Sequence, residues 1–299
     1  MTKKSKPTPC FVKISGVAPE AILNTENLFN DAGESPNSPI DTYVNRSRAL
    51  FTKLGEFERA NLLDINSTDD RHIYNLFLLG FISNVESYFR SIIREVIIID
   101  PIAYQACLEE QVTYAAAIHH KNELLPEALL EHCSFISRDN ISNSIKNFIG
   151  LPLNKQELHT KEVFKNLDLF EQLCQLRHCI VHRAGLLGSK NAVKLGIDSH
   201  KIFFEKPITL NTSFLQESSL ICLNSVRTCN NLLFNLLIHR FIKEYDQCVT
   251  WDFRYDGKWF KPYFKLFSSK VLDAELVNTG RKPISCFEAY DEFRSRYNS

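Results

Sequence analysis

Residues 73–100 read IYNLFLLGFISNVESYFRSIIREVIIID and carry the strongest periodic pattern in the chain. Apolar residues recur every three or four positions, which places them on one face of a helix. They are Ile73, Leu76, Phe77, Phe81, Tyr88, Ile92 and Val96. Asp69 or Asp70 is the expected N-cap, and Pro101 is the expected end. The pattern predicts one long amphipathic helix with its apolar face in the core.

The rest of the chain also favours helices. Helical patterns cover residues 42–64, 168–184 and 214–245, and residues 102–149 are typical of two or three shorter helices. The predicted fold class is therefore mainly α, a helical bundle.

A minor β element is expected after the helix of residues 168–184. Two short β-prone runs, residues 192–197 and 202–205, flank a polar turn at residues 198–201. This arrangement predicts a small β-hairpin insert.

The composition suggests three regions. Residues 1–40 are polar and contain several prolines, and residues 31–39 are typical of a linker. Residues 41–245 carry the helical patterns, and residues 246–299 form an aromatic and basic C-terminal extension. We therefore expect an N-terminal extension, one helical domain and a C-terminal extension.

The overall charge excludes binding to nucleic acid or to anionic membranes by bulk electrostatics. The 299 residues include 35 basic and 35 acidic side chains, so any such contact needs a local patch. We find no run near the roughly 20 apolar residues that span a bilayer, and no secretory signal. The nine cysteines form no C-x-x-C pair, which favours reduced thiols. We expect a cytoplasmic protein with no membrane partner and no cofactor.

Residues 173–185 read LCQLRHCIVHRAG and contain the most informative group of functional side chains. Histidine is suited to proton transfer near neutral pH, and arginine binds phosphate through a planar fork. Arg177, His178 and His182 lie near the end of a predicted amphipathic helix that stops at Gly185. The combination suggests phosphate chemistry.

A purely structural interpretation stays open. With this composition, an Arg-x4-His match arises by chance roughly 0.4 to 0.5 times. Arg183 is a favourable cation at a helix C-terminus, and Gly185 is a suitable left-handed cap.

A metal site is a second alternative. His178 and His182 are four residues apart and share a helix face, as in H-E-x-x-H zinc sites. Here the glutamate is missing, and flanking arginines would repel a dication. We therefore predict no metal ligand.

The third interpretation is acid–base catalysis on RNA, whose 2′-hydroxyl group is an internal nucleophile. His182 would transfer a proton, and Arg177 would stabilise charge on the phosphate oxygens. The helix C-terminus favours the imidazolium form of His182, whereas Arg177 and Arg183 disfavour it. Residues five apart lie about 140° from each other around a helix, so one helix assembles this pair poorly. Two helices related by a two-fold axis place both pairs around one cleft, which predicts a homodimer.

These residues resemble a known family. Residues 176–185, LRHCIVHRAG, are similar to the motif of the HEPN superfamily, in which an arginine, a polar residue and a later histidine end a core helix. Residues 84–95 resemble the second core helix of that family, and residues 214–245 resemble its return helix. The similarity is to ribonuclease-like HEPN domains of the RiboL-PSP and MAE types.

The resemblance implies a dimeric helical bundle that acts as a metal-independent endoribonuclease. Such domains are common in toxin–antitoxin and antiphage systems, which implies an antitoxin or regulatory partner. By position, Arg177 and His182 would be catalytic, His178 would be the polar companion, Glu86 would orient one of them, and Arg90 would be a supporting residue. Glu86 also has a simpler interpretation, a surface pair with Arg90. Some members are non-catalytic, so a dimerisation or RNA-binding module is the alternative function.

Weaker candidates for RNA contact complete the predicted site. Exposed aromatic rings stack on bases and lysines follow phosphates, so the basic and aromatic segment of residues 251–265 is a candidate surface. The proposed contacts are Arg183, Lys190, Arg254, Lys258 and Trp259. Aromatic residues in such a segment also serve as core filler.

Overall fold

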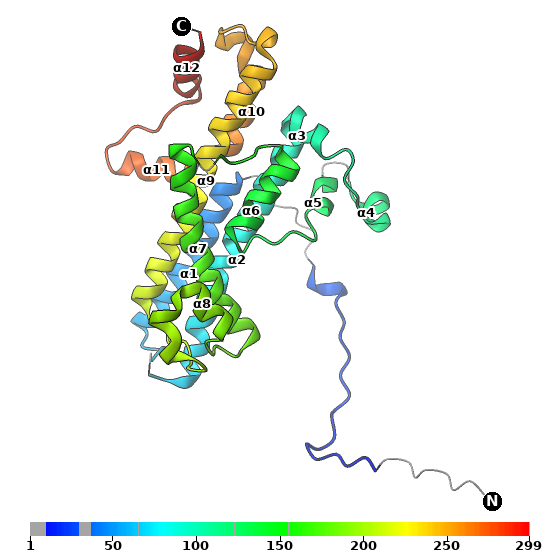
Figure 1. Cartoon of the computed structure of the whole chain (residues 1–299), viewed down its shortest axis with the longest axis vertical. Helices are drawn as coiled ribbons and strands as arrows, with labels where there is room; N and C mark the ends of the chain where they lie inside the picture. Colours follow the sequence, from blue (N-terminus) through cyan, green and yellow to red (C-terminus); the bar gives the residue numbers. More distant parts are fainter. Residues whose placement is uncertain (1–9, 30–36, 65, 122–123, 155, 299) are drawn as a thin grey trace, which may run out of the picture. The chain divides into compact units, whose positions relative to one another are not determined.

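The computed structural model describes residues 10–29, 37–64, 66–121, 124–154 and 156–298. These ranges are mainly helical, which confirms the predicted class (Figure 1). The chain divides into two units, Met1–Pro36 and Asn37–Ser299. Most of the linker expected at residues 31–39 lies outside the described residues. The described part of the first unit is exposed and contains one 3-10 turn, η1 (Glu26–Leu28).

Four long helices form the centre of the second unit. They are α1 (Pro39–Arg59), α2 (Thr68–Ile99), α7 (Leu158–His182) and α9 (Thr212–Glu244). Helix α2 packs against the other three, and α7 also packs along α9. Figure 1 shows these helices running side by side. These four helices fall within residues 39–244 and form a helical bundle.

Helix α2 has the length and the apolar face that its sequence predicts. Its N-cap is Ser67, just before the expected Asp69 or Asp70. The hydroxyl group of Ser67 accepts a hydrogen bond from the backbone N–H of Asp70. Every residue of the predicted stripe is buried or half-buried except Leu76. The helix is long and apolar enough to cross a membrane by composition, but half of its 18-residue apolar window is buried in the fold. A core helix meets the same criterion.

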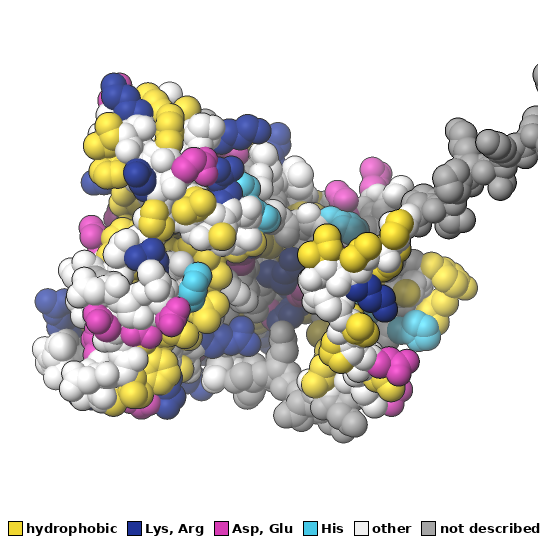
Figure 2. Space-filling model, turned by 90° about the horizontal axis from the view of Figure 1, so that it is seen from below, with side chains coloured by type: hydrophobic (Ala, Val, Ile, Leu, Met, Phe, Trp, Pro, Cys, Tyr) yellow, Lys and Arg dark blue, Asp and Glu magenta, His cyan; other side chains and the backbone are white. Residues whose placement is uncertain are grey.

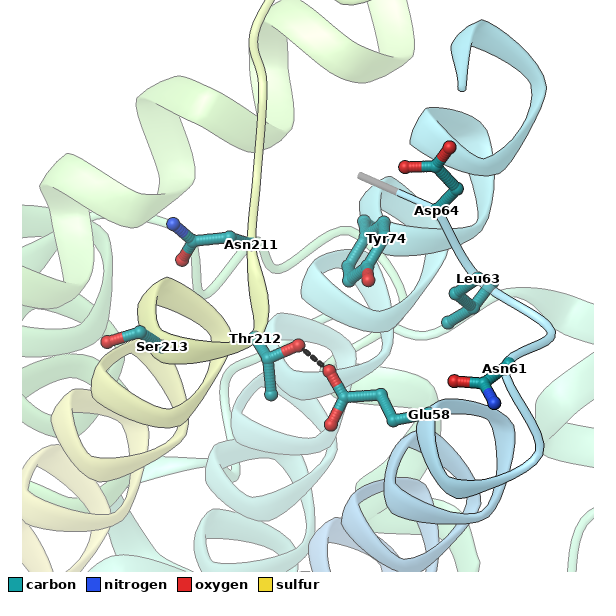
Figure 3. Close-up of a pocket in the computed structure, with 8 residues that line it drawn as sticks. All are labelled: Glu58, Asn61, Leu63, Asp64, Tyr74, Asn211, Thr212 and Ser213. Atoms are coloured by element: carbon teal, nitrogen blue, oxygen red, sulfur yellow. Dashed lines mark hydrogen bonds between the residues drawn. The ribbon is translucent and has the colours of Figure 1, made fainter. Parts of the chain in front are cut away.

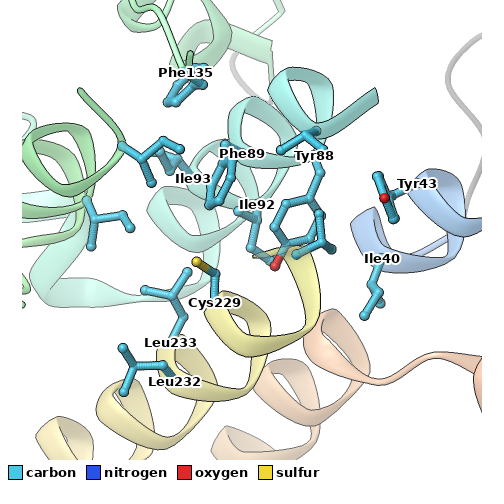
Figure 4. Close-up of a cluster of buried hydrophobic side chains, with 14 of the residues drawn as sticks. Ile40, Tyr43, Tyr88, Phe89, Ile92, Ile93, Phe135, Cys229, Leu232 and Leu233 are labelled. Atoms are coloured by element: carbon cyan, nitrogen blue, oxygen red, sulfur yellow. The ribbon is translucent and has the colours of Figure 1, made fainter. Parts of the chain in front are cut away.

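The core is formed where α2 contacts α9 and α1. Phe89, Ile92 and Ile93 are fully buried, and Figure 4 shows them facing Cys229 and Leu233. Burying an aliphatic or aromatic side chain contributes about 1.5–3 kcal/mol, so this layer supplies much of the stability. A Cβ atom on Gly80 would lie 2.8 Å from Leu50 Cδ1, so α1 and α2 approach closely here and a larger residue would require the Leu50 side chain to shift.

Shorter elements cover one side of α2. They are α3 (Pro101–Ala106), α4 (Tyr114–His119), α5 (Leu125–Leu129), α6 (Arg138–Ser144) and the π-helical turn η3 (Ile145–Ile149). Two or three short helices were expected in residues 102–149, and the described part of this region contains more short helical elements than that. Arg90 and Arg94 both pair with Glu127 of α5, at 3.1 and 3.3 Å. The basic side chains of α2 therefore attach α5 to the bundle.

The predicted β-hairpin is wrong for the described residues. Residues 192–205 form helix α8 (Ser189–His200) and a 3-10 turn, η4 (Lys201–Phe203). Ala192 and Leu195 pack in a small cluster with Cys179. They are three residues apart, which is the spacing of one helix face and not the two-residue alternation of a strand. The helix breaks at Gly196, whose φ is +104°. The nearby β-pairing is one antiparallel bridge between Leu186 and Pro207.

The expected C-terminal extension belongs to the same unit as the bundle. It contains η5 (Asp246–Cys248), α10 (Phe253–Phe267), α11 (Lys270–Asn278) and α12 (Cys286–Tyr297). Phe234 of α9 contacts the rings of Phe260, Phe264, Phe267 and Phe293. The aromatic residues of this region are therefore used for packing.

A buried carboxylate fixes how several helices meet. Asp100 is 2% exposed, and its carboxylate accepts the N–H groups of Ile102 and Ala103 at the start of α3. Arg240 of α9 donates to the same carboxylate at 2.8 Å, and so does the hydroxyl of Tyr263 in α10. One side chain thus joins α3, α9 and α10.

We expect Asp100→Ala to destabilise the protein by about 3–5 kcal/mol, because the guanidinium of Arg240 loses its buried counter-charge. Urea denaturation followed by circular dichroism measures this loss. Asp198→Ala is the matched control, since the Asp198 side chain is 95% exposed and its loss should cost less than about 0.5 kcal/mol. Equal stability of the two variants would contradict the role of Asp100.

A second buried carboxylate, Asp256, organises the start of α10. It accepts the N–H groups of Thr250 and Trp251, the Thr250 hydroxyl, and the Tyr290 hydroxyl at 2.6 Å. Burial alone would raise the pKa of Asp256, but these hydrogen bonds outweigh it and hold the pKa below its usual value.

We expect Tyr290→Phe to cost about 1.5–3 kcal/mol at pH 7, the usual contribution of a hydrogen bond to a charged group. A depressed carboxyl pKa stabilises the fold above the unfolded pKa of about 3.9, and this stability is lost as the pH falls through the folded pKa. The difference from wild type should therefore narrow below about pH 4. Urea titrations at several pH values test this, with the exposed Tyr255→Phe as control. A pH-independent difference would show that the charge of Asp256 is not involved.

Candidate functional site

The motif helix ends in a tight left-handed turn. Helix α7 stops at His182, and Ala184 and Gly185 follow with φ of +52° and +83°. The N–H of Gly185 donates to the carbonyl of Cys179 at 3.0 Å. The expected helix end is confirmed, with Arg183 at the C-cap position. The helix begins ten residues before the expected Asp168, because the buried stripe continues through Val163 and Leu167.

The chain after the turn is tied to a returning segment. The N–H of Ile208 donates to the Gly185 carbonyl at 2.8 Å, and Leu187 exchanges backbone hydrogen bonds with Lys206 and Glu205. The guanidinium of Arg183 pairs with the carboxylate of Glu205. These contacts fix the position of the residues that follow the two histidines.

Arg177 lies on the side of α7 that faces α2. Its Nη2 atom is 4.0 Å from Oε1 of Glu86, and both side chains are 28% exposed. Burial raises the pKa of Glu86, while the positive charges of Arg177 and Arg90 oppose the rise. The structure therefore brings the predicted supporting residue Glu86 beside Arg177.

His178 and His182 form an exposed pair on the last turn of α7. Their ring centroids are 4.5 Å apart. The pKa of His178 is lowered, first by its partial burial and then by the positive charges of His182, Arg177, Arg183 and Lys190. His178 is therefore neutral near pH 7, with a lone pair that can accept a proton or a hydrogen bond.

Arg177 and His182 point in different directions within one chain. Five helical residues rotate the side chain by about 140°. Arg177 is half-buried against α2, whereas His182 is exposed. No contact joins the two side chains in the described part of the chain, as the five-residue spacing predicts.

Other predicted site residues lie away from this helix end. Arg90 donates to Glu127 and to the carbonyls of Leu130 and Cys133, so it attaches α5 instead of reaching the histidines. Arg254 pairs with Asp252 at 2.5 Å on the exposed start of α10.

The remaining candidates in α10 differ in exposure. Lys258 is exposed. Trp259 is half-buried and stacks on Phe241, with centroids 4.3 Å apart and planes inclined by 16°. One face of the indole is therefore already covered by a phenylalanine. On the side of the molecule shown in Figure 2, basic, acidic and apolar side chains are interspersed.

Two asparagines near the helix end were not predicted. Asn191 is 4% exposed and donates to the Gln175 side chain at 3.1 Å, which attaches α8 to α7. Asn75 of α2 is 5% exposed, and its Nδ2 atom would lie 3.7 Å from a Cβ placed on Gly185. Asn75 lies between Ile73 and Leu76 of the apolar stripe, so the available sequence signal was a polar residue in an apolar run.

The histidine pair offers too few ligands for a metal ion. Structural and catalytic zinc sites use at least three protein ligands. Within the described ranges, no group of three or more histidine, cysteine or carboxylate side chains is arranged to hold a metal.

A scan against protein-family models and searches of curated proteins and of solved structures found no match to this chain.

We expect Gly185→Ala to destabilise the protein by about 1–2 kcal/mol, the cost of placing a residue with a Cβ atom in the left-handed region. The added Cβ makes only ordinary contact with Asn75, so the backbone causes the loss. Thermal denaturation measures it. Gly55→Ala in α1, where nothing lies within 4 Å, should instead stabilise the helix by about 0.5–1 kcal/mol. A stability change of the same sign in both variants would contradict the requirement for glycine in the left-handed turn at Gly185.

Proposed function

We propose that this protein is a metal-independent endoribonuclease of the HEPN type. The observation that carries the proposal is the exposed imidazole pair of His178 and His182, with ring centroids 4.5 Å apart at the end of α7. Arg177, immediately before the pair, is held at 4.0 Å from Glu86. Histidine and arginine together supply the proton transfer and the charge stabilisation that phosphodiester cleavage needs.

The reaction uses the nucleophile that RNA itself carries. The 2′-oxygen attacks the adjacent phosphorus, and the P–O5′ bond breaks to leave a 2′,3′-cyclic phosphate and a 5′-hydroxyl group. His182 accepts the 2′-proton, and the imidazolium so formed donates a proton to the leaving 5′-oxygen. Arg177 binds the non-bridging oxygens, where negative charge develops. His178, neutral near pH 7, is the polar companion that hydrogen-bonds the phosphate or the sugar.

The proposed site is complete only in a homodimer. Arg177 faces α2 and His182 faces solvent, so a second copy is needed to place an arginine and a histidine around one phosphate. The neighbouring elements α8 and η4 expose apolar side chains, among them Val193 and Ile202 at 62% and 70%. Exposed apolar groups of this kind favour a protein contact.

A defence role follows from the same proposal. An RNA-cleaving dimer in the cytoplasm is harmful to its own cell, so it requires restraint by an antitoxin or another regulatory protein. We propose that the protein is a toxin or an antiphage effector on the strength of the family resemblance.

A non-catalytic module is the second candidate, and one observation favours it. Arg177 lies beside Glu86 and Arg183 pairs with Glu205, so two cations near the histidines already face carboxylates. A module of this kind would dimerise or bind RNA in support of another effector.

We expect His182→Ala to lower the rate of RNA cleavage by about 10²–10⁴-fold, the usual contribution of a general acid or base. The assay follows folded transfer and ribosomal RNA in the presence of chelator, with product ends identified as cyclic phosphates. His159→Ala is the matched control, because His159 is exposed on the first turn of the same helix. Substrates with 2′-O-methyl groups should not be cleaved. A wild type that is inert with and without metal would support the non-catalytic module instead.

Mixed dimers test whether the site is shared. We expect Arg177→Ala and His182→Ala each to be inactive, and their co-expressed mixture to recover about a quarter of wild-type activity, because half of the dimers would each hold one complete pair. No recovery, from a mixture shown to contain the mixed dimer, would exclude a site formed in trans. A wild-type protein that is monomeric would also exclude a site formed in trans.

A further inference from the structure

Arg71, near the start of α2, is an arginine without a counter-charge. It is half-buried, and its Nε atom is buried with no hydrogen-bond partner among the described residues. Its guanidinium also forms no ion pair within the described part of the chain. Arg177 and Arg183, in contrast, lie beside Glu86 and Glu205. The helix dipole disfavours a cation near the start of a helix, so Arg71 gains no stabilisation from α2 either.

The carboxamide of Asn75 lies on the same face of α2 and also has an atom without a partner. Residues four apart share a helix face, and a helical side chain leans toward the N-terminus, so the Asn75 amide leans toward the turn that carries Arg71. Asn75 is 5% exposed, and its Oδ1 atom is buried without a hydrogen bond among the described residues. Buried polar groups are nearly always hydrogen-bonded. Helix α2 thus carries an unpaired donor and an unpaired acceptor one turn apart.

This pair of side chains lies beside the end of the motif helix. The Nδ2 atom of Asn75 would be 3.7 Å from a Cβ placed on Gly185, which follows His182 by three residues. Arg71 precedes Asn75 by four residues, or about 6 Å along the axis of α2. The arginine is therefore close to the segment that follows the two histidines.

The nearest acidic side chains lie around another side of α2. Glu58, Asp64 and Tyr74 line one hollow, at the ends of α1 and α9 that face Tyr74 (Figure 3). Tyr74 and Asn75 are adjacent residues, so their side chains diverge by about 100° around the helix. Neither carboxylate forms an ion pair with Arg71 in the described ranges. The guanidinium is therefore left for an anion from outside the chain.

We propose that Arg71 binds a flanking phosphate of the RNA, and that Asn75 positions its guanidinium. A guanidinium has five N–H donors in a planar fork. When Nε donates to the Asn75 oxygen, both Nη groups remain for two oxygens of one phosphate. Arg71 is thus a binding residue and Asn75 a positioning residue, and neither touches the reacting atoms. The inference rests on the proposed nuclease, because it takes RNA as the ligand.

Binding of a 2′-O-methyl RNA to the full chain tests the proposal, because this RNA binds without being cleaved. Fluorescence anisotropy at several potassium chloride concentrations measures the affinity. Arg71→Ala should weaken binding at least about tenfold at low salt, the loss of a charge-assisted hydrogen bond. It should also reduce the slope of log affinity against log salt by about one, as the loss of one phosphate contact does. Arg71→Lys keeps the charge but not the fork, and should weaken binding by about threefold.

A double-mutant cycle tests whether Asn75 acts through Arg71. Asn75→Leu has similar volume and no amide, and should weaken RNA binding by about three- to tenfold. It should have no further effect in the Arg71→Ala background. Its thermal stability should equal or exceed that of wild type, because the variant removes a buried atom without a partner, whereas a structural role would lower it. Equal weakening in both backgrounds would overturn the positioning role.

Arg296→Ala is the matched control, since it removes one exposed arginine from α12. It should leave the affinity for RNA nearly unchanged. Equal effects of Arg296→Ala and Arg71→Ala, or no RNA binding by wild type, would overturn the proposal. Inorganic phosphate that displaces RNA from wild type but not from Arg71→Ala would assign Arg71 to a free anion instead. RNA that binds through Arg71 without being cleaved would contradict the nuclease alone, whereas cleavage that Arg71→Ala leaves intact would contradict Arg71 alone.

Discussion

The buried ion pair between Asp100 and Arg240 holds the bundle in one arrangement. Two opposite charges that are 2% and 11% exposed are stable only when their geometry is right and their remaining hydrogen-bonding atoms are used. Asp100 meets this condition through α3 and Tyr263. Arg240 meets it in part: it also donates to the carbonyl of Ile149 in η3, but its buried Nε atom has no hydrogen-bond partner among the described residues. The pair therefore opposes a shift of α9 relative to the end of α2, because separating the two charges would leave each one buried without its partner.

The functional end of the bundle depends on that arrangement. With α2 and α9 held together, α7 packs along both, and its last turns lie against the first half of α2. The antiparallel course explains two contacts at once: Glu86 meets Arg177, and Asn75, about three turns earlier in α2, meets Gly185. The position of each side chain at the candidate site is thus determined by residues far from it.

Local patterns in the sequence predicted most of the helices but few of their partners. The stripes of α2 and α9 were long enough to exceed any other signal, so these helices were expected correctly. The segment of α8 was misread because a short apolar run fits both periods, and only its contact with Cys179 distinguishes them. Likewise, helical spacing offered a surface pair of Glu86 with Arg90 as an alternative, whereas a carboxylate farther along the chain, Glu127, binds Arg90. Contacts between distant segments leave no periodic trace in one sequence.

At the candidate site, too, features within one helix were predictable from the sequence, whereas contacts between helices were not. The spacing of Arg177 and His182 predicted that they diverge around the helix, which follows from 3.6 residues per turn alone. The approach of Glu86 to Arg177 was expected from family resemblance and not from any pattern in the chain. That contact has a chemical consequence for the proposed nuclease. A carboxylate at 4.0 Å attracts the arginine toward α2, and a phosphate must compete with it for the guanidinium. Burial raises the pKa of Glu86, so this carboxylate becomes protonated at a higher pH than an exposed one. As the pH falls, Glu86 loses its negative charge and attracts Arg177 less, and the arginine is then more available to the RNA.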